Sequence, residues 1–513
     1  MKWLKPSMVL LFLIALGCKT PQPVAEAKED HTVTFKFVQL NDVYEIAPLS
    51  GGKYGGMARV AHVFDSIRAV EPNTFMVMAG DFLNPSLLGT LKVDGQRIAG
   101  KQMIEVMNAM NFELATFGNH EFDLDEEVLQ QRLDESNFYW TSANVFQNNP
   151  EGPRSFFFRR NNDTIYVPET YTIPLKANDG SQVDIGLFGV TLPSNPKDYV
   201  YYADIFLEAR SAYTALKMQQ VDVIVGLTHL EIEQDVELAN QLPDVELIMG
   251  GHEHNNMLVP TDHAIVAKAD ANAKTIYIHS FVYNTKTGKV KFDSHLMPID
   301  HKIASKPEVA ALVGKWNAIL DDKIKEVVDR PNEVIYHAKP PLDGTDGANR
   351  SIQTNLGAVI TGAMKASYNN EVDLTLVNGG SFRVDDMLAG DLTSIDVFRI
   401  LPFGGQVLKV DMTGELLTKV LDYGKSARDS GAYLQRKDVG ENAEGKWLVD
   451  GNLIDPGRTY SVAISDFLLK GFDIPFLTHD HKGVIKVHTP KVGDVAFDIR
   501  KSVIVYLKSL PSE

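Results

Sequence analysis

Cysteine is almost absent from this chain of 513 residues: Cys18 is the only one, so no intramolecular disulfide can form. No segment after Cys18 is both long and apolar enough to span a membrane. Basic residues are scarce as well, with 50 lysines and arginines against 67 aspartates and glutamates and a formal net charge of -17. This balance argues against binding DNA or RNA over a broad surface. A small phosphorylated ligand needs only a few local cations and is not excluded.

The first 18 residues, MKWLKPSMVLLFLIALGC, place Lys2 and Lys5 before an apolar run that ends in small residues and Cys18. This arrangement predicts a signal peptide, because the run is too short for a stable spanning helix. It resembles a bacterial lipoprotein signal, in which the cysteine is lipidated; an ordinary secretory signal with a chance cysteine is the alternative. We expect a cell-envelope protein anchored to a membrane through a lipid on Cys18, on the periplasmic or outer face. Residues 19–31 are expected to form a flexible tether.

The rest of the chain is too long for one core and predicts two domains. From residue 32 to 303, short apolar runs alternate with helical stretches, a pattern typical of α/β layering. The runs expected to be buried strands are TVTFKFVQL, FMVMAG, VDIGLFGV, VDVIVGLTH and VELIMGG. Residues 304–330 have apolar side chains at helical spacing and predict a single linker helix. A second α/β or α+β domain is expected over 331–513.

Several predicted strands of the first domain stop at side chains that bind metals. These residues are Asp42, Asp81, Asn119, His120, Asp123, His229, His252 and His254. Taken singly, each has an ordinary explanation as a turn, a helix cap or a buried histidine. Five successive strand ends of this kind predict a metal site, because the strand ends of an open α/β sheet meet at one edge. Aspartate, asparagine and imidazole together suit Mn, Fe, Zn or mixed pairs.

The order Asp-x-(His), Gly-Asp, Gly-Asn-His-Glu, Thr-His and Gly-His-x-His resembles that of the calcineurin-like metallophosphoesterases. With the second domain, the resemblance extends from about residue 33 to 505 and indicates the 5′-nucleotidase family. It implies a helix-flanked β-sandwich, a linker helix and a nucleotide-recognition domain. It also implies two divalent metal ions (Mn, Zn, Co, Fe or Mg), with these ligands: Asp42 and His254 on the first, Asp81 bridging both, and Asn119, His229 and His252 on the second. His120 and Asp123 match the family's catalytic pair.

The same resemblance assigns a nucleotide pocket to the second domain. It implies that Arg350, Asn378 and Arg383 bind phosphate, that Phe403 and Phe467 stack on the base, and that Asp473 holds the ribose. The chemistry suits these roles, because arginine presents a planar fork to phosphate and aromatic faces stack on bases. Taken singly, Phe403 and Phe467 would be interpreted as core residues and Arg383 as a surface charge.

The family pattern is broken at one position. The triplet Asp-Val-Tyr at residues 42–44 carries Tyr44 where the resemblance expects a metal-binding histidine. Residues two apart on an extended segment face the same side, so Tyr44 is expected to point towards the metals. It could bind as a phenolate, lie beside the metal and hydrogen-bond a ligand or phosphate, or mark loss of the first metal. Because the other ligands and the nucleotide pocket are retained, we favour the second interpretation.

The sequence therefore predicts a metal-dependent phosphohydrolase that releases phosphate from 5′-nucleotides outside the cytoplasm. Alternative substrates within the family are nucleotide sugars, nucleoside di- or triphosphates and cyclic nucleotides. A different class is a nucleotide-binding protein with weakened catalysis, if Tyr44 has cost the first metal. A nuclease is a third possibility, which the acidic charge and the lack of basic runs oppose. The expected partner is a small nucleotide and not a nucleic acid polymer.

Overall fold

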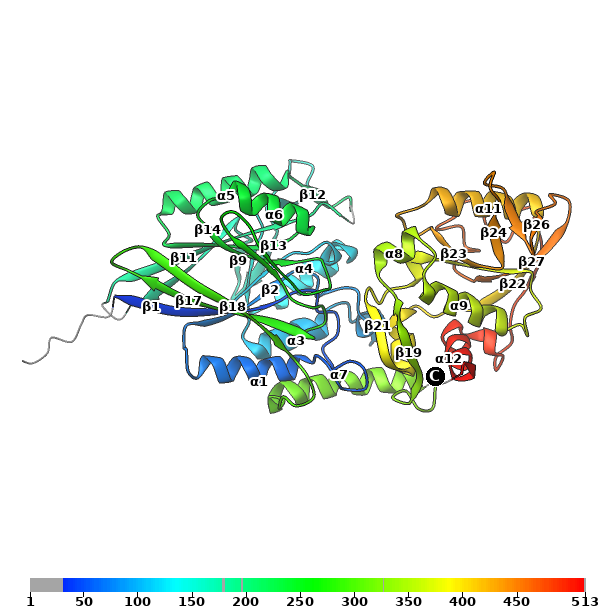
Figure 1. The fold of residues 1–513 in the computed structure, drawn as a ribbon, viewed down its shortest axis with the longest axis horizontal. Coiled ribbons are helices and arrows are strands. Elements are labelled where there is room, and N and C mark those ends of the chain that lie inside the picture. The colour runs from blue at the N-terminus through cyan, green and yellow to red at the C-terminus, as the bar shows by residue number, and fades with distance from the viewer. Residues whose placement is uncertain (1–30, 178–179, 195–196, 326, 512–513) are drawn as a thin grey trace, which may run out of the picture.

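The computed structural model describes residues 31–511, except 178–179, 195–196 and 326 (Figure 1). The predicted signal peptide and nearly all of the predicted tether lie outside the described residues. Among the described helices, none has the length and apolar character needed to cross a membrane. The chain forms two α/β domains that lie side by side, which agrees with the predicted fold class (Figure 1).

The first domain is a sandwich of two six-stranded sheets. One sheet has the order β18 (Lys289–Pro298), β17 (Thr275–Asn284), β1 (Thr32–Leu40), β2 (Thr74–Ala79), β5 (Leu114–Thr116), β6 (Tyr139–Thr141). The other has the order β10 (Thr170–Lys176), β11 (Gln182–Thr191), β13 (Val223–His229), β14 (Val245–Gly251), β16 (Ile265–Lys268), β15 (Met257–Pro260). Phe37 and Val77 of the first sheet share one buried cluster with Val225 and Leu247 of the second.

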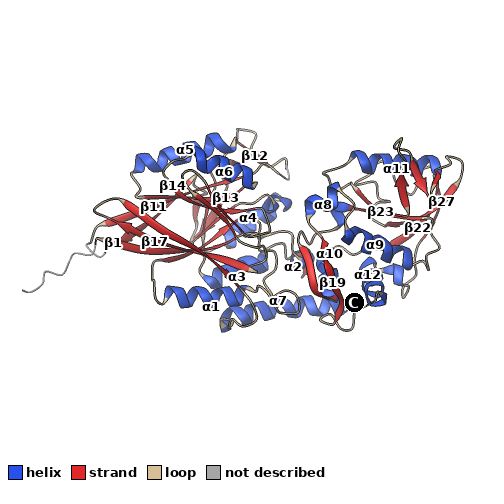
Figure 2. Ribbon diagram, in the orientation of Figure 1, coloured by secondary structure: helices blue, strands red, loops and turns tan. Residues whose placement is uncertain are grey.

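Helices cover the outer faces of this sandwich (Figure 2). Helices α1 (Met57–Arg68), α3 (Lys101–Met110) and α4 (Glu126–Glu135) pack against the first sheet, and α5 (Ile205–Gln219) and α6 (Ile232–Gln241) against the second. The central strands are therefore buried on both faces, which explains their nearly continuous apolar runs. Strands β1 and β2 are parallel, as are β13 and β14, so the predicted ligands follow their carboxyl ends.

Helix α7 (Pro307–Lys325) lies within the predicted linker and runs below the first domain towards the second (Figure 1). It packs against α1 and α3, and the indole N–H of its buried Trp316 donates to Glu105 Oε2 at 3.1 Å. These contacts join the linker firmly to the first domain. A rotation of the second domain would therefore pivot at the far end of α7.

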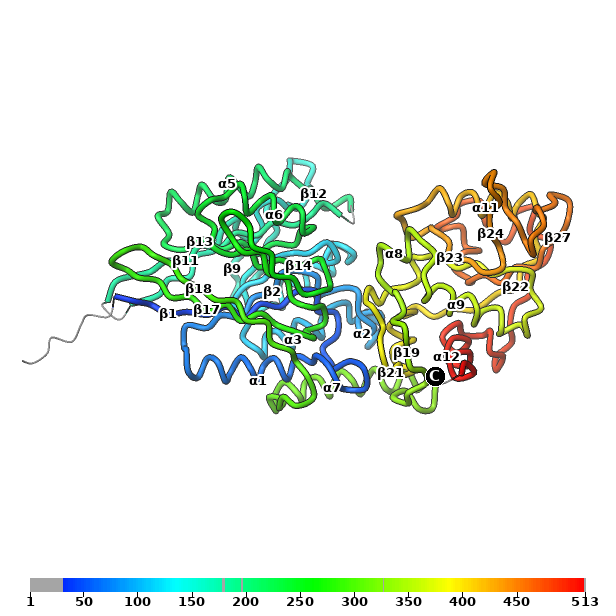
Figure 3. The backbone as a smooth tube through the Cα atoms, viewed as in Figure 1, coloured from blue at the N-terminus to red at the C-terminus, as the bar shows by residue number. Residues whose placement is uncertain are grey.

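The second domain is built on a mixed five-stranded sheet. Its order is β23 (Leu434–Lys437), β20 (Leu374–Asn378), β27 (Thr459–Ser465), β22 (Val407–Thr413), β28 (Val484–His488). Helices α9 (Asn355–Ala366) and α12 (Ile499–Ser509) pack together beside it, and α11 (Gly414–Ser426) covers another part. A two-stranded ribbon, β19 (Val334–Asp343) with β21 (Met387–Thr393), lies on the side that faces the first domain (Figure 3).

The segment before β21 touches the strand ends of the first domain. Arg383 Nη2 lies 3.3 Å from Asp123 Oδ2, and Lys274 Nζ lies 2.5 Å from Asp386 Oδ2. Close by, Glu45 of the first domain faces the buried guanidinium of Arg399, with Nε to Oε1 at 3.7 Å. The candidate site therefore lies where the two domains meet.

Candidate active site

The ligands predicted for the second metal converge. One ligand atom from each of Asp81, His229 and His252 can be chosen so that all three lie within 4.8 Å of one another. His229 Nε2 lies 3.1 Å from Asp81 Oδ2 and 3.1 Å from Asn119 Oδ1. The four predicted ligands thus come from four different strand ends. A carboxylate, an amide oxygen and two imidazoles form a donor set that fits a divalent transition metal.

The backbone holds these side chains in place. His229 is fully buried and its Nδ1 lies 2.8 Å from the carbonyl oxygen of Ala79. A proton on Nδ1 donates to that carbonyl and leaves Nε2 as the lone-pair nitrogen for a metal. Asp42, Asp81 and His252 adopt positive φ angles of 54°, 56° and 84°. Such strain is uncommon outside glycine and is typical of functional sites.

The first metal's predicted ligands are less closely gathered. Asp42 Oδ1 and His254 Nε2 are 3.5 Å apart, but neither residue joins a compact three-residue group within the described part of the chain. Tyr44 fills the space between them: its hydroxyl lies 3.4 Å from Asp42 Oδ1, 3.4 Å from Asp81 Oδ2 and 3.1 Å from His254 Nε2. Tyr44 therefore faces the metal ligands, as predicted, although the segment is not extended as expected: β1 ends at Leu40 and Asp42 has a positive φ.

Without a metal, the surroundings of Tyr44 favour its protonated form. Burial of the ring, together with the nearby charges of Asp81 and Asp42, raises the pKa of Tyr44 well above its ordinary value of 10. A protonated phenol is a poor metal ligand but a good hydrogen-bond donor to carboxylates. The three interpretations of Tyr44 stay predictions.

Glu121 organises the site, a role that we did not predict. Its buried carboxylate accepts hydrogen bonds from four backbone amides, those of Asp81, Phe82, Leu83 and Gly118, at 2.7–3.0 Å. It thereby joins the loop after β2 to the loop after β5. The approach is so close that a Cβ on Gly118 would lie 2.1 Å from Asp81 Oδ1. The motif Gly-Asn-His-Glu was the signal: its glycine permits the contact and its glutamate makes it.

His120 and Asp123 form the expected pair in the 3₁₀ turn η1 (His120–Asp123), with Nδ1 to Oδ2 at 2.8 Å. Asn84 also donates to Asp123 Oδ2, at 2.7 Å. Burial alone would lower the pKa of His120, but the charges of Asp81 and Asp123 raise that pKa to about 10. In the metal-free protein the imidazole therefore carries its positive charge at neutral pH. Held in this way, it could stabilise an oxyanion or protonate a leaving oxygen.

A buried lysine supports the loop that carries His252 and His254. Lys268 Nζ, fully buried, lies 2.8 Å from Asp235 Oδ2, pairs with Glu253 and donates to the Leu230 carbonyl at 2.6 Å. Glu253 lies between the two histidines in the sequence. The ion pair therefore fixes the histidine loop to the second sheet.

We expect Lys268→Met to lower the free energy of unfolding of the metal-free protein by about 3–5 kcal/mol, because two carboxylates lose their buried partner. Lys217→Met is the matched control. Lys217 pairs with Asp244 at 3.0 Å, and both side chains are about half exposed. That exposed pair is worth less than about 1 kcal/mol. Denaturant unfolding measures both variants, and equal effects would show that the Lys268 pair does not support the loop.

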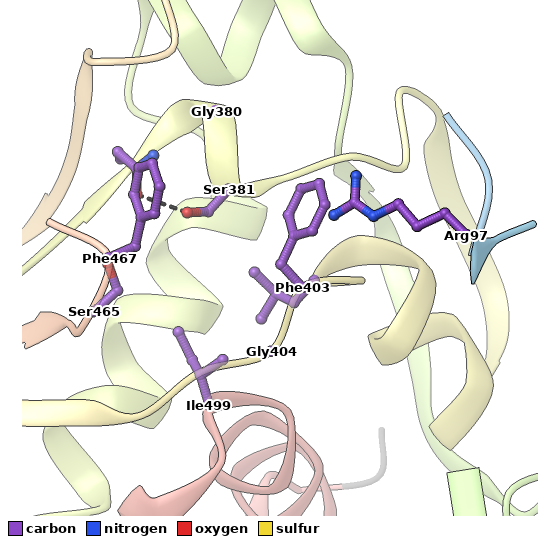
Figure 4. Close-up of a pocket in the computed structure, with 10 residues that line it drawn as sticks. Arg97, Gly380, Ser381, Phe403, Gly404, Ser465, Phe467 and Ile499 are labelled. Carbon is purple, nitrogen blue, oxygen red and sulfur yellow. Dashed lines mark hydrogen bonds between the residues drawn. The ribbon is translucent and has the colours of Figure 1, made fainter. Parts of the chain in front are cut away.

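The predicted base-stacking residues line one cavity of about 480 Å³ in the second domain. Phe403 follows α10 (Ser394–Ile400) and Phe467 follows β27, and Figure 4 shows both rings projecting into the cavity. Asn378 lies at its wall and accepts a hydrogen bond from Ser381 at 2.6 Å. Figure 4 also shows Arg97, from the first domain, beside the Phe403 ring.

A second cavity of about 240 Å³ adjoins the first. Arg97 and Phe403 line both cavities, while Asp123 and Arg383 line the second. Arg97 belongs to a short hairpin, β3 (Lys92–Val93) with β4 (Gln96–Arg97), that sequence reasoning did not connect with the site. The two cavities thus adjoin at Arg97 and Phe403, and the second one reaches Asp123 of the catalytic pair.

Two predicted substrate residues are placed differently. Arg350 and Asp473 lie outside the linings of these two cavities. Arg350 forms an ion pair with Asp346 at 2.8 Å, and Asp473 accepts a hydrogen bond from Asn378 at 2.7 Å. Asp473 therefore adjoins the cavity through Asn378. Their assignments to phosphate and ribose remain predictions.

Comparison with known proteins supports the assignment of both domains. The calcineurin-like phosphoesterase family profile matches residues 35–256, and the profile for the C-terminal domain of 5′-nucleotidases matches residues 334–479. The chain is 26% identical over 532 residues to a 5′-nucleotidase of Vibrio cholerae, covering 91% of this chain and 90% of that protein. It is 27% identical over 414 residues to a trifunctional nucleotide phosphoesterase of Bacillus subtilis, covering 73% of this chain but spanning only 27% of that longer protein.

Solved structures show the same fold. The structure of a 5′-nucleotidase precursor from Thermus thermophilus matches with a TM-score of 0.65 at 22% identity, over 94% of this chain and 97% of that one. A sulfate thiohydrolase, SoxB, from the same genus matches with a TM-score of 0.60 at 14% identity, over 92% and 94%. Because a 5′-nucleotidase and a sulfate thiohydrolase share this fold, the fold does not identify the substrate, which has to be inferred from the residues of the site.

Proposed function

The chain belongs to the 5′-nucleotidase family of phosphoester hydrolases, and we propose that it releases phosphate from 5′-nucleoside monophosphates outside the cytoplasm, from a lipid anchor on Cys18. The two adjoining cavities, lined from both domains, carry this proposal. Phe403 and Arg97 line both the aromatic cavity and the neighbouring one that contains Asp123 and Arg383. A base held between Phe403 and Phe467 would place its 5′-phosphate towards the metal ligands.

The residues divide the chemistry among them. Two divalent cations held by the ligands at the strand ends would supply a water of lowered pKa and neutralise charge on the phosphate. His120 would stabilise charge on the leaving oxygen and give it a proton, while Asp123 fixes its ring through Nδ1 at 2.8 Å. Arg383, at 3.3 Å from Asp123, would donate N–H groups from one edge of its guanidinium to a phosphate oxygen.

The alternative substrates differ in the chemical groups attached to the reacting phosphate, and therefore in the room that the site must provide. A nucleotide sugar or a nucleoside triphosphate needs room past the reacting group, and a cyclic nucleotide presents a diester. The Bacillus relative is named a trifunctional nucleotide phosphoesterase. More than one class of nucleotide should therefore be tested as a substrate of this chain. A binding protein with weakened catalysis is favoured by one observation, the Tyr44 hydroxyl among the first metal's ligands.

A substrate panel tests the proposal. The purified chain, reconstituted separately with Mn, Zn and Co, is given 5′-AMP, ATP, a uridine diphosphate sugar, 2′,3′-cyclic AMP and single-stranded DNA, and free phosphate is measured. We expect the highest kcat/KM with 5′-AMP and no cleavage of the DNA. A preference for one of the other nucleotides would replace the proposed substrate, and binding without phosphate release would favour the binding protein.

Removing the Phe467 ring should weaken binding of the nucleotide base without affecting hydrolysis of the phosphate ester. We expect Phe467→Ala to raise KM for 5′-AMP by about 5- to 150-fold, because stacking on one base is worth about 1–3 kcal/mol. Hydrolysis of a small aryl phosphate, which lacks the base, should change little. Tyr166→Ala, which removes an exposed ring from β9 (Asp163–Tyr166), is the control. If activity falls equally on 5′-AMP and on the aryl phosphate, Phe467 stabilises the domain and does not stack on the base.

A further inference from the structure

The hairpin formed by β3 and β4 brings a cation of the first domain to the aromatic cavity of the second. Its turn residues, Asp94 and Gly95, have positive φ angles of 50° and 82°, as a two-residue hairpin turn of type I′ requires. Arg97 follows this turn and lines both the aromatic cavity and the smaller cavity that contains Asp123. Figure 4 shows its guanidinium directed towards the Phe403 ring. A ligand that reaches from one cavity into the other therefore passes Arg97.

The end of the hairpin is fixed to the first domain. Ile98, the residue after Arg97, is buried, and its backbone amide donates to the Leu91 carbonyl at 2.9 Å. The Ile98 carbonyl accepts a hydrogen bond from Nη1 of the buried Arg132 in α4, at 2.8 Å. The fold of the first domain therefore places Arg97 at the two cavities, while its side chain stays exposed.

The charge of Arg97 has no partner within the protein. Its guanidinium forms no hydrogen bond or ion pair with another residue in the part of the chain that the structure describes. Arg383, the other arginine that lines these cavities, is held by Asp123 at 3.3 Å. Across the hairpin, Arg97 stands opposite Lys92, and like charges in this position destabilise a strand pair. An anion bound beside Arg97 would relieve that repulsion, so the hairpin favours a negatively charged ligand.

The group that lies beside Arg97 depends on the number of phosphates in the nucleotide. When the base lies between Phe403 and Phe467 and the terminal phosphate reacts, a 5′-monophosphate places its uncharged ribose next to the reacting group. A 5′-diphosphate places its inner phosphate there, and this phosphate accepts charge-assisted hydrogen bonds from a guanidinium. Asp123 and Asp125 line the same cavity and repel an anion. The charge of Arg97 therefore matters for the diphosphate and little for the monophosphate.

From these observations we propose that Arg97 is a specificity-determining residue, supplied by the first domain, that binds the inner phosphate of a nucleoside 5′-diphosphate while the terminal phosphate is hydrolysed. Water adds across the bond between the terminal phosphorus and the bridging oxygen, which gives inorganic phosphate and a 5′-monophosphate. That product is the substrate of the proposed function, on which this inference rests.

The test compares 5′-AMP with 5′-ADP in the wild type, Arg97→Gln and Arg97→Lys, with the products separated by chromatography. Arg97→Gln removes the charge and keeps a polar side chain. We expect its kcat/KM for 5′-ADP to fall about 10- to 150-fold, the effect of losing a hydrogen bond to a charged group, while kcat/KM for 5′-AMP changes little. Arg97→Lys keeps the charge without the planar fork, so it should recover part of the loss.

Lys92→Gln is the matched control, because it removes one charge from the same hairpin and Lys92 lines neither cavity. It should lower kcat/KM for 5′-ADP less than Arg97→Gln does. Equal losses in these two variants would assign the effect to the general charge of the hairpin and overturn the proposal. Equal losses on 5′-AMP and 5′-ADP in Arg97→Gln, or a wild type that acts on 5′-AMP but not on 5′-ADP, would overturn it as well.

Nucleotide binding separates this inference from the proposed function. If the Mn-loaded wild type hydrolyses neither nucleotide, the proposed function fails, and the affinities for 5′-AMP and 5′-ADP are measured by calorimetric titration. A loss of affinity confined to 5′-ADP in Arg97→Gln would then still support the role of Arg97. Unchanged affinity for 5′-ADP in that variant would contradict it.

Discussion

Asp81→Asn should reduce hydrolysis of 5′-AMP by at least about a thousandfold, which corresponds to about 4 kcal/mol of transition-state stabilisation. Asp81 is fully buried, and its Oδ2 faces both His229 Nε2 at 3.1 Å and the Tyr44 hydroxyl at 3.4 Å. Asp81 is thus placed between a ligand of the second metal and the group beside the first. Asp81→Asn removes the negative charge of the carboxylate that is predicted to bind both cations, and two cations close together need that charge.

The substitution should leave the fold intact. Asparagine has the same shape, tolerates the φ angle of 56° and keeps an oxygen for the His120 amide, which donates to Asp81 Oδ1 at 2.8 Å. Elemental analysis should find fewer than two metals per chain, with unfolding close to that of metal-free wild type. Asp65→Asn, an exposed carboxylate of α1 paired with Lys306, is the control. Activity within about tenfold of wild type in Asp81→Asn would remove the metal assignment.

His120→Asn should lower kcat for 5′-AMP by about 10²- to 10⁴-fold without changing the number of bound metals. The imidazole is predicted to be the group that meets the leaving oxygen and not a ligand. A nucleoside leaves as an alkoxide and needs a proton, whereas a nitrophenolate does not. The loss should therefore be clearly smaller on a nitrophenyl phosphate, and this difference identifies proton donation.

The control for this variant is His263→Asn, an exposed histidine before β16. It should leave kcat and metal content unchanged. If His120→Asn loses metal, the histidine is a ligand and the role of the pair is misassigned. If both substrates lose the same factor, His120 stabilises the phosphoryl group and donates no proton in the rate-limiting step.

Much of the first domain was predictable because its central strands are buried on both faces. β13 is buried at every position, and such strands read as continuous apolar runs. Their ends were visible as the points where Asp81 or His229 interrupts the run. The direction of Tyr44 was predicted from the alternation of side chains in an extended segment, but β1 ends at Leu40 and Asp42 has a φ angle of 54°, so the outcome was right for a reason that the structure does not share.

Contacts between distant segments were not predictable. Glu121 belongs to a recognised motif, but its four amide partners depend on how two loops approach each other. Arg97 reaches the aromatic cavity only because a hairpin of the first domain crosses to the second. Asp385 Oδ2 of the second domain lies 3.4 Å from His254 Nε2 of the first, and this contact depends on the relative position of the two domains, which no local pattern encodes.

The most direct measurement of the central claim follows metal content and product in one sample. Metal-stripped wild type is titrated with Mn, and at each step the bound metal, the phosphate and the nucleoside formed from 5′-AMP are determined together. We predict that turnover rises with binding of the second metal equivalent and that one phosphate appears for each nucleoside. A chain that binds two metals and 5′-AMP yet releases no phosphate, or one whose turnover does not depend on metal, would contradict this account.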